Sequence, residues 1–394
     1  MKNKILFVVQ RYGLEVNGGS EAYCRQIAEK LSSIYDVSVL TTCAEDYVTW
    51  ENKYQEGIEK INDITVIRKK VVEPRTQKKF SKATDIINFD KENLLSGIEW
   101  QKAQGPYSLE LLNYLSNHKE EYDVIIYMTY LYFTTYFGIQ IAPEKSILIP
   151  TAHDEPPIYF GIFNSIFHLP RRILYLTNSE KNFVTKKFHN NYVNSDIVGV
   201  GIDIEKDVEN INLKDRFHIE DEYLIYLGRI DESKGCKNMI DYFLEYKAKY
   251  NNNLKLALAG KTAMNIPVNN DILNLGFVSE IEKINLLKNA KALILPSEFE
   301  SLSLSTLEAM YFGIPVLVNG KCDVLKDHAI LSKAGLYYMN KLEFIESLAY
   351  IDENPEIMKK MGENGVLYVE KNYRWDVVIE KYKNAIEKVR KINQ

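Results

Sequence analysis

The sequence has few of the residues that build disulfide frameworks or metal centres. Its 394 residues include six histidines and only four cysteines, namely Cys24, Cys43, Cys236 and Cys322. The cysteines are too far apart for a disulfide framework or for paired zinc ligands. No Asp-x-Asp pair occurs. We therefore expect no metal site, and the isolated thiols favour a reducing cytoplasm.

Long apolar runs are also missing. No uncharged stretch reaches the roughly 18 to 20 residues needed to cross a bilayer. The run Ile5–Val9 is too short for the core of a signal peptide, so we expect no export. The net charge is −5, from 49 basic and 54 acidic side chains, which disfavours nucleic acid as a partner.

The composition does supply ample material for buried cores. Apolar residue types make up 46% of the chain and charged types 26%, and the length predicts two or three domains. Short β-branched runs alternate with helical patterns, which predicts parallel sheets of the α/β class. The expected strands are Ile5–Val9, Val37–Thr41, Ile64–Ile67, Val124–Tyr127, Ile147–Ile149, Ile173–Leu176, Ile197–Val200, Tyr223–Leu227, Leu254–Ala259, Leu273–Phe277, Ala292–Leu295 and Val316–Val318.

The pattern predicts two domains of the same doubly wound type. We expect a first domain over 1–202, a polar and charged linker over 203–220, a second domain over 221–372, and a C-terminal amphipathic helix within 373–394. Ligands of such sheets bind beyond the carboxyl ends of the strands. The loops that follow strands are therefore the places to look for a site.

A turn after the first strand of the second half contains two cations five residues apart. Arg229 follows Gly228, and Lys234 comes at the end of the turn. A guanidinium can bind two phosphate oxygens and an ammonium acts as a point charge, so the pair suits a nucleotide diphosphate. In an ordinary turn the same cations would pair with Asp231 and Glu232, and the sequence leaves both interpretations open.

A serine-rich turn joins another strand to a helix between Pro296 and Pro315. Exposed amides and a helix N-terminus can bind phosphate there without side-chain charge. Glu300 is expected in the loop and Glu308 in the helix. Ser305 and Glu308 also fit a capping box, and spacing alone favours that structural role. The other candidate contacts in the turn are Ser301, Leu302, Ser303 and Leu304.

Two loops of the first half are further candidates. Gly18 and Gly19 follow the first strand and would let a ligand approach the backbone, although a plain tight turn is the commoner explanation. Ser20 is expected to cap the helix Ser20–Ser32. His153 and Asp154 follow a later strand, where they could meet a substrate hydroxyl or form a local hydrogen-bonded cap.

Two surface features bear on the acceptor. The segment from Arg68 to Lys82 carries seven basic residues against Glu73, which would suit an anionic leaflet or be a solvated loop. The apolar run from Tyr159 to Phe167 leads to Arg171 and Arg172, and a buried position is favoured over membrane contact for this run.

Together, these motifs resemble the retaining glycosyltransferases of family four, which have the GT-B fold. The resemblance spans nearly the whole chain and is strongest from Tyr226 to Val318. The turn Ser301-Leu302-Ser303 departs from it, because the family usually has Gly-Phe-Gly there. The shared marks are Gly18-Gly19, His153-Asp154, Gly228-Arg229, Lys234-Gly235, the E-x7-E pair Glu300 and Glu308, Gly313-Ile-Pro315 and the helix at Trp375.

The resemblance implies a fold and a role for each motif. Two Rossmann-like doubly wound domains would face a central cleft, and the C-terminal helix would cross back to the first domain. The implied roles are a diphosphate clamp for Arg229 and Lys234, ribose binding for Glu308, contact with the transferred sugar for Glu300, contact with the reacting sugar for His153, and closure over the phosphates for Gly18-Gly19.

The implied activity is the metal-independent transfer of a hexose or N-acetylhexosamine with retention at the anomeric carbon. The donor would be a nucleotide diphosphate sugar, with UDP preferred, and no further cofactor is expected. The acceptor would be a glycan, a glycoprotein or a lipid-linked glycan in the cytoplasm or at the inner face of the membrane, in surface-polysaccharide or glycoprotein assembly. The alternatives are a nucleotide-sugar epimerase or hydrolase of the same fold, and a non-catalytic glycan-recognising subunit.

Overall fold

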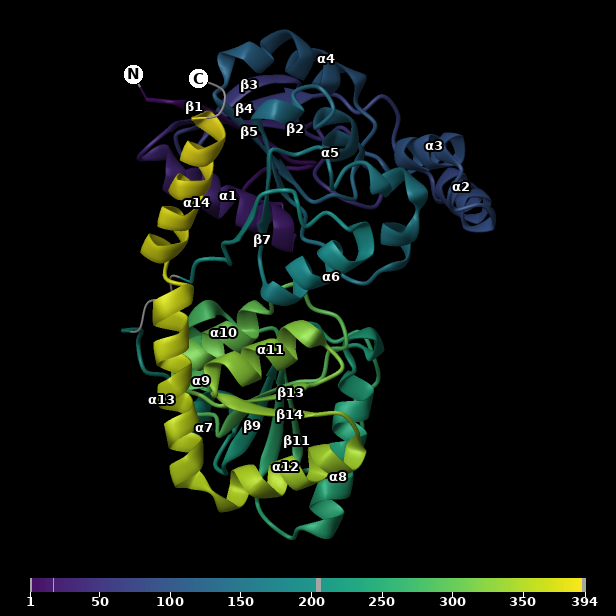
Figure 1. Ribbon diagram of the computed structural model, residues 1–394. Helices are drawn as coiled ribbons and strands as arrows, with labels where there is room; N and C mark the ends of the chain where they lie inside the picture. Colours follow the sequence, from purple (N-terminus) through teal and green to yellow (C-terminus); the bar gives the residue numbers. More distant parts are fainter. Residues whose placement is uncertain (1, 17, 203–206, 392–394) are drawn as a thin grey trace. The chain divides into compact units, whose positions relative to one another are not determined.

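The computed structural model describes residues 2–16, 18–202 and 207–391 (Figure 1). The chain divides into two compact units, Met1–Val200 with Val378–Gln394, and Gly201–Val377. Each unit is built on one predominantly parallel sheet with helices packed against it. The predicted α/β class with two Rossmann-like domains is therefore confirmed.

The expected linker over 203–220 is only partly described. Its first four positions, 203–206, lie outside the described residues. Farther along, the short helix α7 (Leu213–Phe217) begins after Asn212, whose side chain accepts hydrogen bonds from two amides of the first turn. This part of the polar segment therefore forms a short helix, whereas its low hydrophobicity indicated only a linker.

In the described part of the first unit, the sheet has eight strands in the order β3-β4-β2-β1-β5-β6-β7-β8. The pairing is parallel except between β3 and β4. Because the chain runs outward from β1 in both directions, the topological switch point lies between β1 and β5. The strands are β1 (Lys4–Val8), β2 (Asp36–Thr42), β3 (Gly57–Ile61), β4 (Ile64–Lys69), β5 (Val124–Met128), β6 (Ser146–Ile149), β7 (Arg172–Tyr175) and β8 (Ser195–Ile197).

The helices of the first unit begin mostly at capping side chains. Thr76, Asn93, Ser108 and Thr177 each accept a hydrogen bond from an amide of the first turn. α5 has no side-chain cap, and neither has α1, whose N-cap is Gly18, so the prediction that Ser20 caps α1 is wrong. The helices are α1 (Gly19–Ser32), α2 (Gln77–Phe89), α3 (Leu94–Gln104), α4 (Leu109–His118), α5 (Phe133–Gly138), α6 (Asn178–Phe188) and, from Val378 onward, α14 (Trp375–Arg390).

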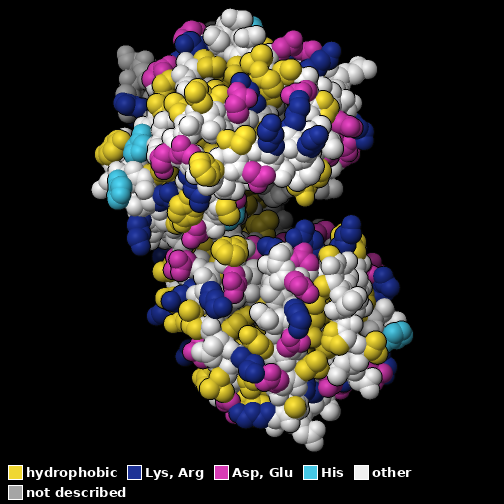
Figure 2. Space-filling model, turned by 90° about the vertical axis from the view of Figure 1, so that its right-hand side faces the viewer, with side chains coloured by type: hydrophobic (Ala, Val, Ile, Leu, Met, Phe, Trp, Pro, Cys, Tyr) yellow, Lys and Arg dark blue, Asp and Glu magenta, His cyan; other side chains and the backbone are white. Residues whose placement is uncertain are grey.

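The two segments considered for acceptor or membrane contact differ in burial, because most basic side chains of the first segment are exposed to solvent. The run from Arg68 to Lys82 crosses β4 and α2, where Arg68 is buried in an ion pair with Glu59 and Lys79 binds Glu73 at 2.7 Å. The apolar run ending at Phe167 is mainly buried, as expected. On the face shown in Figure 2, basic and acidic side chains are interspersed.

In the second unit, the described residues form a six-stranded parallel sheet in the order β11-β10-β9-β12-β13-β14. This order places the switch point between β9 and β12, each of which begins and ends at the predicted residues. The strands are β9 (Tyr223–Leu227), β10 (Lys255–Ala259), β11 (Ile272–Gly276), β12 (Ala292–Leu295), β13 (Val316–Asn319) and β14 (Gly335–Tyr338).

The helices of the second unit form two packed groups (Figure 1). Helices α8 (Cys236–Lys249) and α12 (Lys341–Glu353) contact each other, and α10 (Leu304–Tyr311) and α11 (Asp323–Ser332) both pack on α13 (Pro355–Asn372). Helix α9 (Glu280–Lys288) precedes β12 and has a capping box formed by Ser279 and Glu282.

The loops that follow β9, β10 and β12 pack closely against one another through their backbones. Gly235 has a φ of 76°, and a Cβ added to it would lie 2.6 Å from the carbonyl oxygen of Pro296. A Cβ on Gly260 would lie 1.8 Å from the carbonyl oxygen of Gly228. The loops after β9, β10 and β12 can therefore pack this closely only because glycine stands at these positions.

We predict that Gly235→Ala destabilises the second unit more than Gly276→Ala. Both glycines have left-handed φ angles, which cost an alanine about 1–2 kcal/mol. Only Gly235 also faces a neighbouring backbone, because the space around Gly276 is open. Urea unfolding of both variants measures the difference, and equal losses of stability would contradict the constraint at Pro296.

Candidate functional site

The loops after β9 and β12 meet at the switch point of the second sheet. The Lys234 Nζ atom donates a hydrogen bond to a Glu300 carboxylate oxygen at 2.8 Å, which joins the two predicted motifs directly. Lys234 ends the 3-10 turn η5 (Glu232–Lys234), and Glu300 lies in the turn before α10. The structure therefore brings together the basic turn and the serine-rich turn.

Arg229 has a different partner from Lys234. Its guanidinium pairs with Asp231, as expected for an ordinary turn, and 58% of the Arg229 side-chain surface is exposed. The Asp231 carboxylate also accepts from the Ser233 hydroxyl and the Lys234 amide, and these bonds, with Arg229, hold its pKa below the usual value. Lys234 does not follow that alternative, since its ammonium binds Glu300 rather than Glu232.

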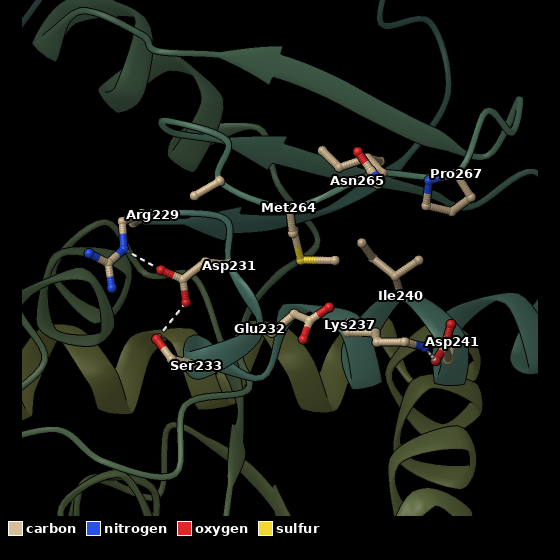
Figure 3. A pocket seen from close by; sticks show the side chains of 12 residues that line it. Arg229, Asp231, Glu232, Ser233, Lys237, Ile240, Asp241, Met264, Asn265 and Pro267 are labelled. Atoms are coloured by element: carbon tan, nitrogen blue, oxygen red, sulfur yellow. Dashed lines mark hydrogen bonds and ion pairs between the residues drawn. The ribbon is translucent and has the colours of Figure 1, made fainter.

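A cavity of about 1000 Å³ opens beside Arg229 (Figure 3). Residues of η5 and of the N-terminal part of α8 line one side of the cavity. The loop after β10, from Ala263 to Pro267, lines the other side. Its size suits a small molecule. Of the predicted site residues only Arg229 lines it, so the cavity does not include the Lys234–Glu300 contact. The lining residues are Arg229, Asp231, Glu232, Ser233, Lys237, Ile240, Asp241, Ala263, Met264, Asn265, Ile266 and Pro267.

The start of α10 has the features of an anion site. Its N-cap, Ser303, has a left-handed φ of 64° and makes no side-chain cap. The Ser303 hydroxyl is instead hydrogen-bonded to Thr306 Oγ1 at 2.8 Å. The first amides of a helix have no partner inside the helix, and here they lack a capping side chain as well. A phosphate can be bound at such an end.

Glu308 does not form the capping box that its spacing favoured. Helix α10 begins at Leu304, so Glu308 lies too far along the helix to reach the cap. Its carboxylate pairs with Lys283 of α9 at 3.0 Å. Burial raises the pKa of Glu308, and the Lys283 ammonium opposes this rise. The structural alternative for Glu308 is therefore wrong, and the side chain is held toward α9.

His328 is a residue of this site that sequence reasoning missed. It lies on α11 with only 2% of its surface exposed, and its Nε2 is 2.9 Å from the carbonyl oxygen of Leu302. Its Nδ1 is 3.2 Å from the Tyr368 hydroxyl. Burial lowers the pKa of His328 to about 4, so the ring is neutral near pH 7. No local spacing links it to the serine-rich turn.

The glycines of the first unit have unequal surroundings. A Cβ added to Gly18 would lie 2.3 Å from the carboxylate of Glu21, which forms a buried ion pair with Arg11 at 2.5 Å. Gly18 therefore makes room for this pair. No atom lies within 4 Å of a Cβ added to Gly19, so a ligand could approach the backbone there. The preceding Asn17 lies outside the described residues.

His153 and Asp154 bind different neighbours in the loop after β6. His153 Nε2 lies 3.6 Å from the Glu155 carboxylate, whereas Asp154 accepts from the Tyr159 hydroxyl at 2.7 Å. The turn that follows has no side-chain cap, so the capping alternative is wrong. His153 is partly exposed and keeps access for a ligand.

A buried carboxyl that the sequence did not single out holds the same loop. Glu180 accepts hydrogen bonds from the amides of Ala152 at 2.7 Å and Leu176 at 2.6 Å. Burial raises the pKa of Glu180 to about 8, although these amides favour the charged form. Glu180 therefore fixes the backbone immediately before His153.

Over residues 2–16, 18–202 and 207–391, no group of three or more His, Cys, Asp or Glu side chains is arranged to hold a metal ion. None of the helices described here combines the length and the apolar character required to cross a bilayer.

Comparison with known proteins shows which glycosyltransferases this chain resembles. Residues 207–367 match the family described as glycosyl transferases group 1. An uncharacterized glycosyltransferase of Methanocaldococcus jannaschii is 24% identical over 309 residues, which are 69% of this chain and 76% of that protein. The matched residues lie within the second unit and include the loops that meet at the switch point.

Solved structures agree on the fold. Sucrose-phosphate synthase from Thermosynechococcus elongatus superposes with a TM-score of 0.70 at 15% identity, over 98% of this chain and 99% of that one. Anabaena HepE in complex with UDP and glucose gives 0.68 at 12% identity, over 98% and 100%. The fold of this chain is therefore GT-B.

The buried histidine generates a prediction about pH. An unfolded histidine binds a proton below about pH 6.5, whereas folded His328 stays neutral down to about pH 4. The unfolded state binds more protons between these values, so this contribution to stability is complete above pH 6.5 and is lost as the pH falls. The full shift corresponds to on the order of 3 kcal/mol.

We therefore expect wild-type protein to lose more unfolding free energy than His328→Gln between pH 7 and pH 4.5. Denaturant unfolding at several pH values measures both slopes. Parallel slopes would show that His328 is not held neutral in the folded protein.

Proposed function

We propose that the protein transfers a sugar from a nucleotide diphosphate sugar to a glycan or lipid-linked glycan acceptor, with retention of anomeric configuration and without a metal ion. The observation that carries this proposal is the Lys234–Glu300 contact. It joins the loops after β9 and β12 at the switch point, next to the uncapped start of α10. Ligands of doubly wound sheets bind at such points.

In this proposal the leaving diphosphate is stabilised by three groups of the second unit. The N-terminal amides of α10 supply dipoles, Lys234 supplies a compact charge, and Arg229 supplies the donors that its bond to Asp231 leaves available. Preorganised charges of this kind favour the transition state, in which negative charge builds up on the diphosphate. Glu308 is proposed to bind the ribose hydroxyls.

Retention calls for the acceptor to attack from the side on which the diphosphate leaves. We propose that a diphosphate oxygen takes the acceptor proton, with Glu300 in contact with the transferred sugar and His153 in contact with a sugar hydroxyl. The competing route is double displacement by a protein carboxylate, for which Glu300 is the candidate nucleophile. UDP is the preferred donor nucleotide, and the solved complex of Anabaena HepE with UDP and glucose supports this preference.

Nucleotide binding tests the proposal most directly. We expect one of UDP, GDP, ADP and dTDP to raise the unfolding temperature, since a ligand at 100 times its dissociation constant adds about 2.7 kcal/mol. Stabilisation by none of the four would favour a non-catalytic subunit. Rapid turnover of the sugar donor without any acceptor would instead favour a hydrolase or an epimerase.

We predict that Lys234→Ala lowers the rate of sugar transfer by about a hundredfold or more, which is the scale for losing one preorganised charge donor. Lys249→Ala is the matched control, because Lys249 ends α8, does not line the cavity and is ion-paired with Glu346 at 2.5 Å. Steady-state transfer assays on both folded variants measure the difference. Similar rates for the two variants would contradict the role of Lys234.

A further inference from the structure

We propose that His328 is a positioning residue that holds the phosphate-binding turn in its binding conformation through the carbonyl of Leu302. This inference rests on the proposed function, since it concerns the same turn. His328 lies on α11 and is proposed to touch no substrate. Its effect would pass through one peptide group, the one between Leu302 and Ser303.

The geometry of that peptide links the buried histidine to the surface. In a planar trans peptide, the carbonyl of one residue and the N–H of the next point in opposite directions. The Leu302 carbonyl points toward the buried ring of His328, 2.9 Å away. The Ser303 amide therefore points away from the ring, and it precedes the uncapped first amides of α10. A rotation of this peptide would turn the amide inward.

The turn needs such a restraint because of the residue at position 303. Ser303 has a φ of 64° and a ψ of 81°, which a non-glycine residue adopts only at a steric cost. Glycine would adopt these angles without that cost. A hydrogen bond from a buried donor can offset the cost, because its loss would leave the Leu302 carbonyl without this partner in the core.

The surroundings of His328 fix which nitrogen donates. A carbonyl oxygen can only accept, so Nε2 carries the proton and Nδ1 is the acceptor for the Tyr368 hydroxyl at 3.2 Å. The Tyr368 hydroxyl also lies 3.3 Å from the hydroxyl of Tyr373, at the end of α13. The Leu302 carbonyl and Tyr368 of α13 thus both favour the one tautomer that can bind the turn.

The test compares two substitutions of similar length and shape. His328→Gln keeps an N–H that can donate to Leu302, whereas His328→Met keeps the volume and lacks the donor. The probe is UDP, or whichever of the four nucleoside diphosphates stabilises the wild type most, and the dissociation constant is measured by calorimetry. We expect about tenfold weaker binding for His328→Met, and binding within about threefold of wild type for His328→Gln.

The decisive step adds Ser303→Gly to His328→Met. Glycine adopts the left-handed conformation without help, so the double variant should recover most of the lost affinity. A role of His328 in packing alone predicts no recovery. Equal affinity of wild type and His328→Met, or a loss that Ser303→Gly does not repair, would overturn the inference.

Failure of the wild type to bind a nucleotide and failure of His328→Met to fold have different meanings. If wild-type protein binds none of the nucleoside diphosphates, the proposed function fails, whatever His328 does. If His328→Met does not fold, His328→Asn replaces it, because its amide can take the place of Nδ1 beside Tyr368 but is too short to reach the Leu302 carbonyl. His328→Asn should weaken binding about tenfold with recovery by Ser303→Gly, and unchanged affinity would overturn the inference.

Discussion

The close approach of two loops at the switch point of the second sheet is the constraint on which the candidate site depends. Gly235 lets the end of the basic turn lie against the carbonyl of Pro296, four residues before Glu300. A side chain there would push the loops after β9 and β12 apart. The 2.8 Å contact between Lys234 and Glu300 is a consequence of this backbone packing, as is the position of the turn that leads into α10.

Much of the fold could be predicted because buried parallel strands read as continuous apolar runs. β9 and β12, on either side of the switch point, have the predicted bounds. β3 was missed because its residues are mostly exposed and it contains no long apolar run. β14 was missed because its short run contains only one fully buried residue. The predicted strand Ile197–Val200 was displaced, since β8 already ends at Ile197.

The sequence predicted which loops form the candidate site, but it did not predict which side chains contact each other there. Arg229, Lys234 and Glu300 stand in loops after strands, and parallel topology brings such loops to one edge. The partner of each side chain depends on distances across the fold. Glu308 forms an ion pair with Lys283 in place of the capping box that its spacing favoured. His328 binds the Leu302 carbonyl from another helix. Neither contact has a local signal in the sequence.

The pairing of Lys234 with Glu300 has a further consequence for the proposed reaction. A diphosphate that binds Lys234 competes with the Glu300 carboxylate for the same ammonium, because both are anions. The ion pair of Glu300 with Lys234 is then weakened, and the Glu300 carboxylate is available to the sugar attached to that diphosphate. Binding of the phosphates and release of the carboxylate are thus coupled through one lysine side chain. The pair therefore gives a physical reason why the cation and the acid stand on facing loops and not on the same one.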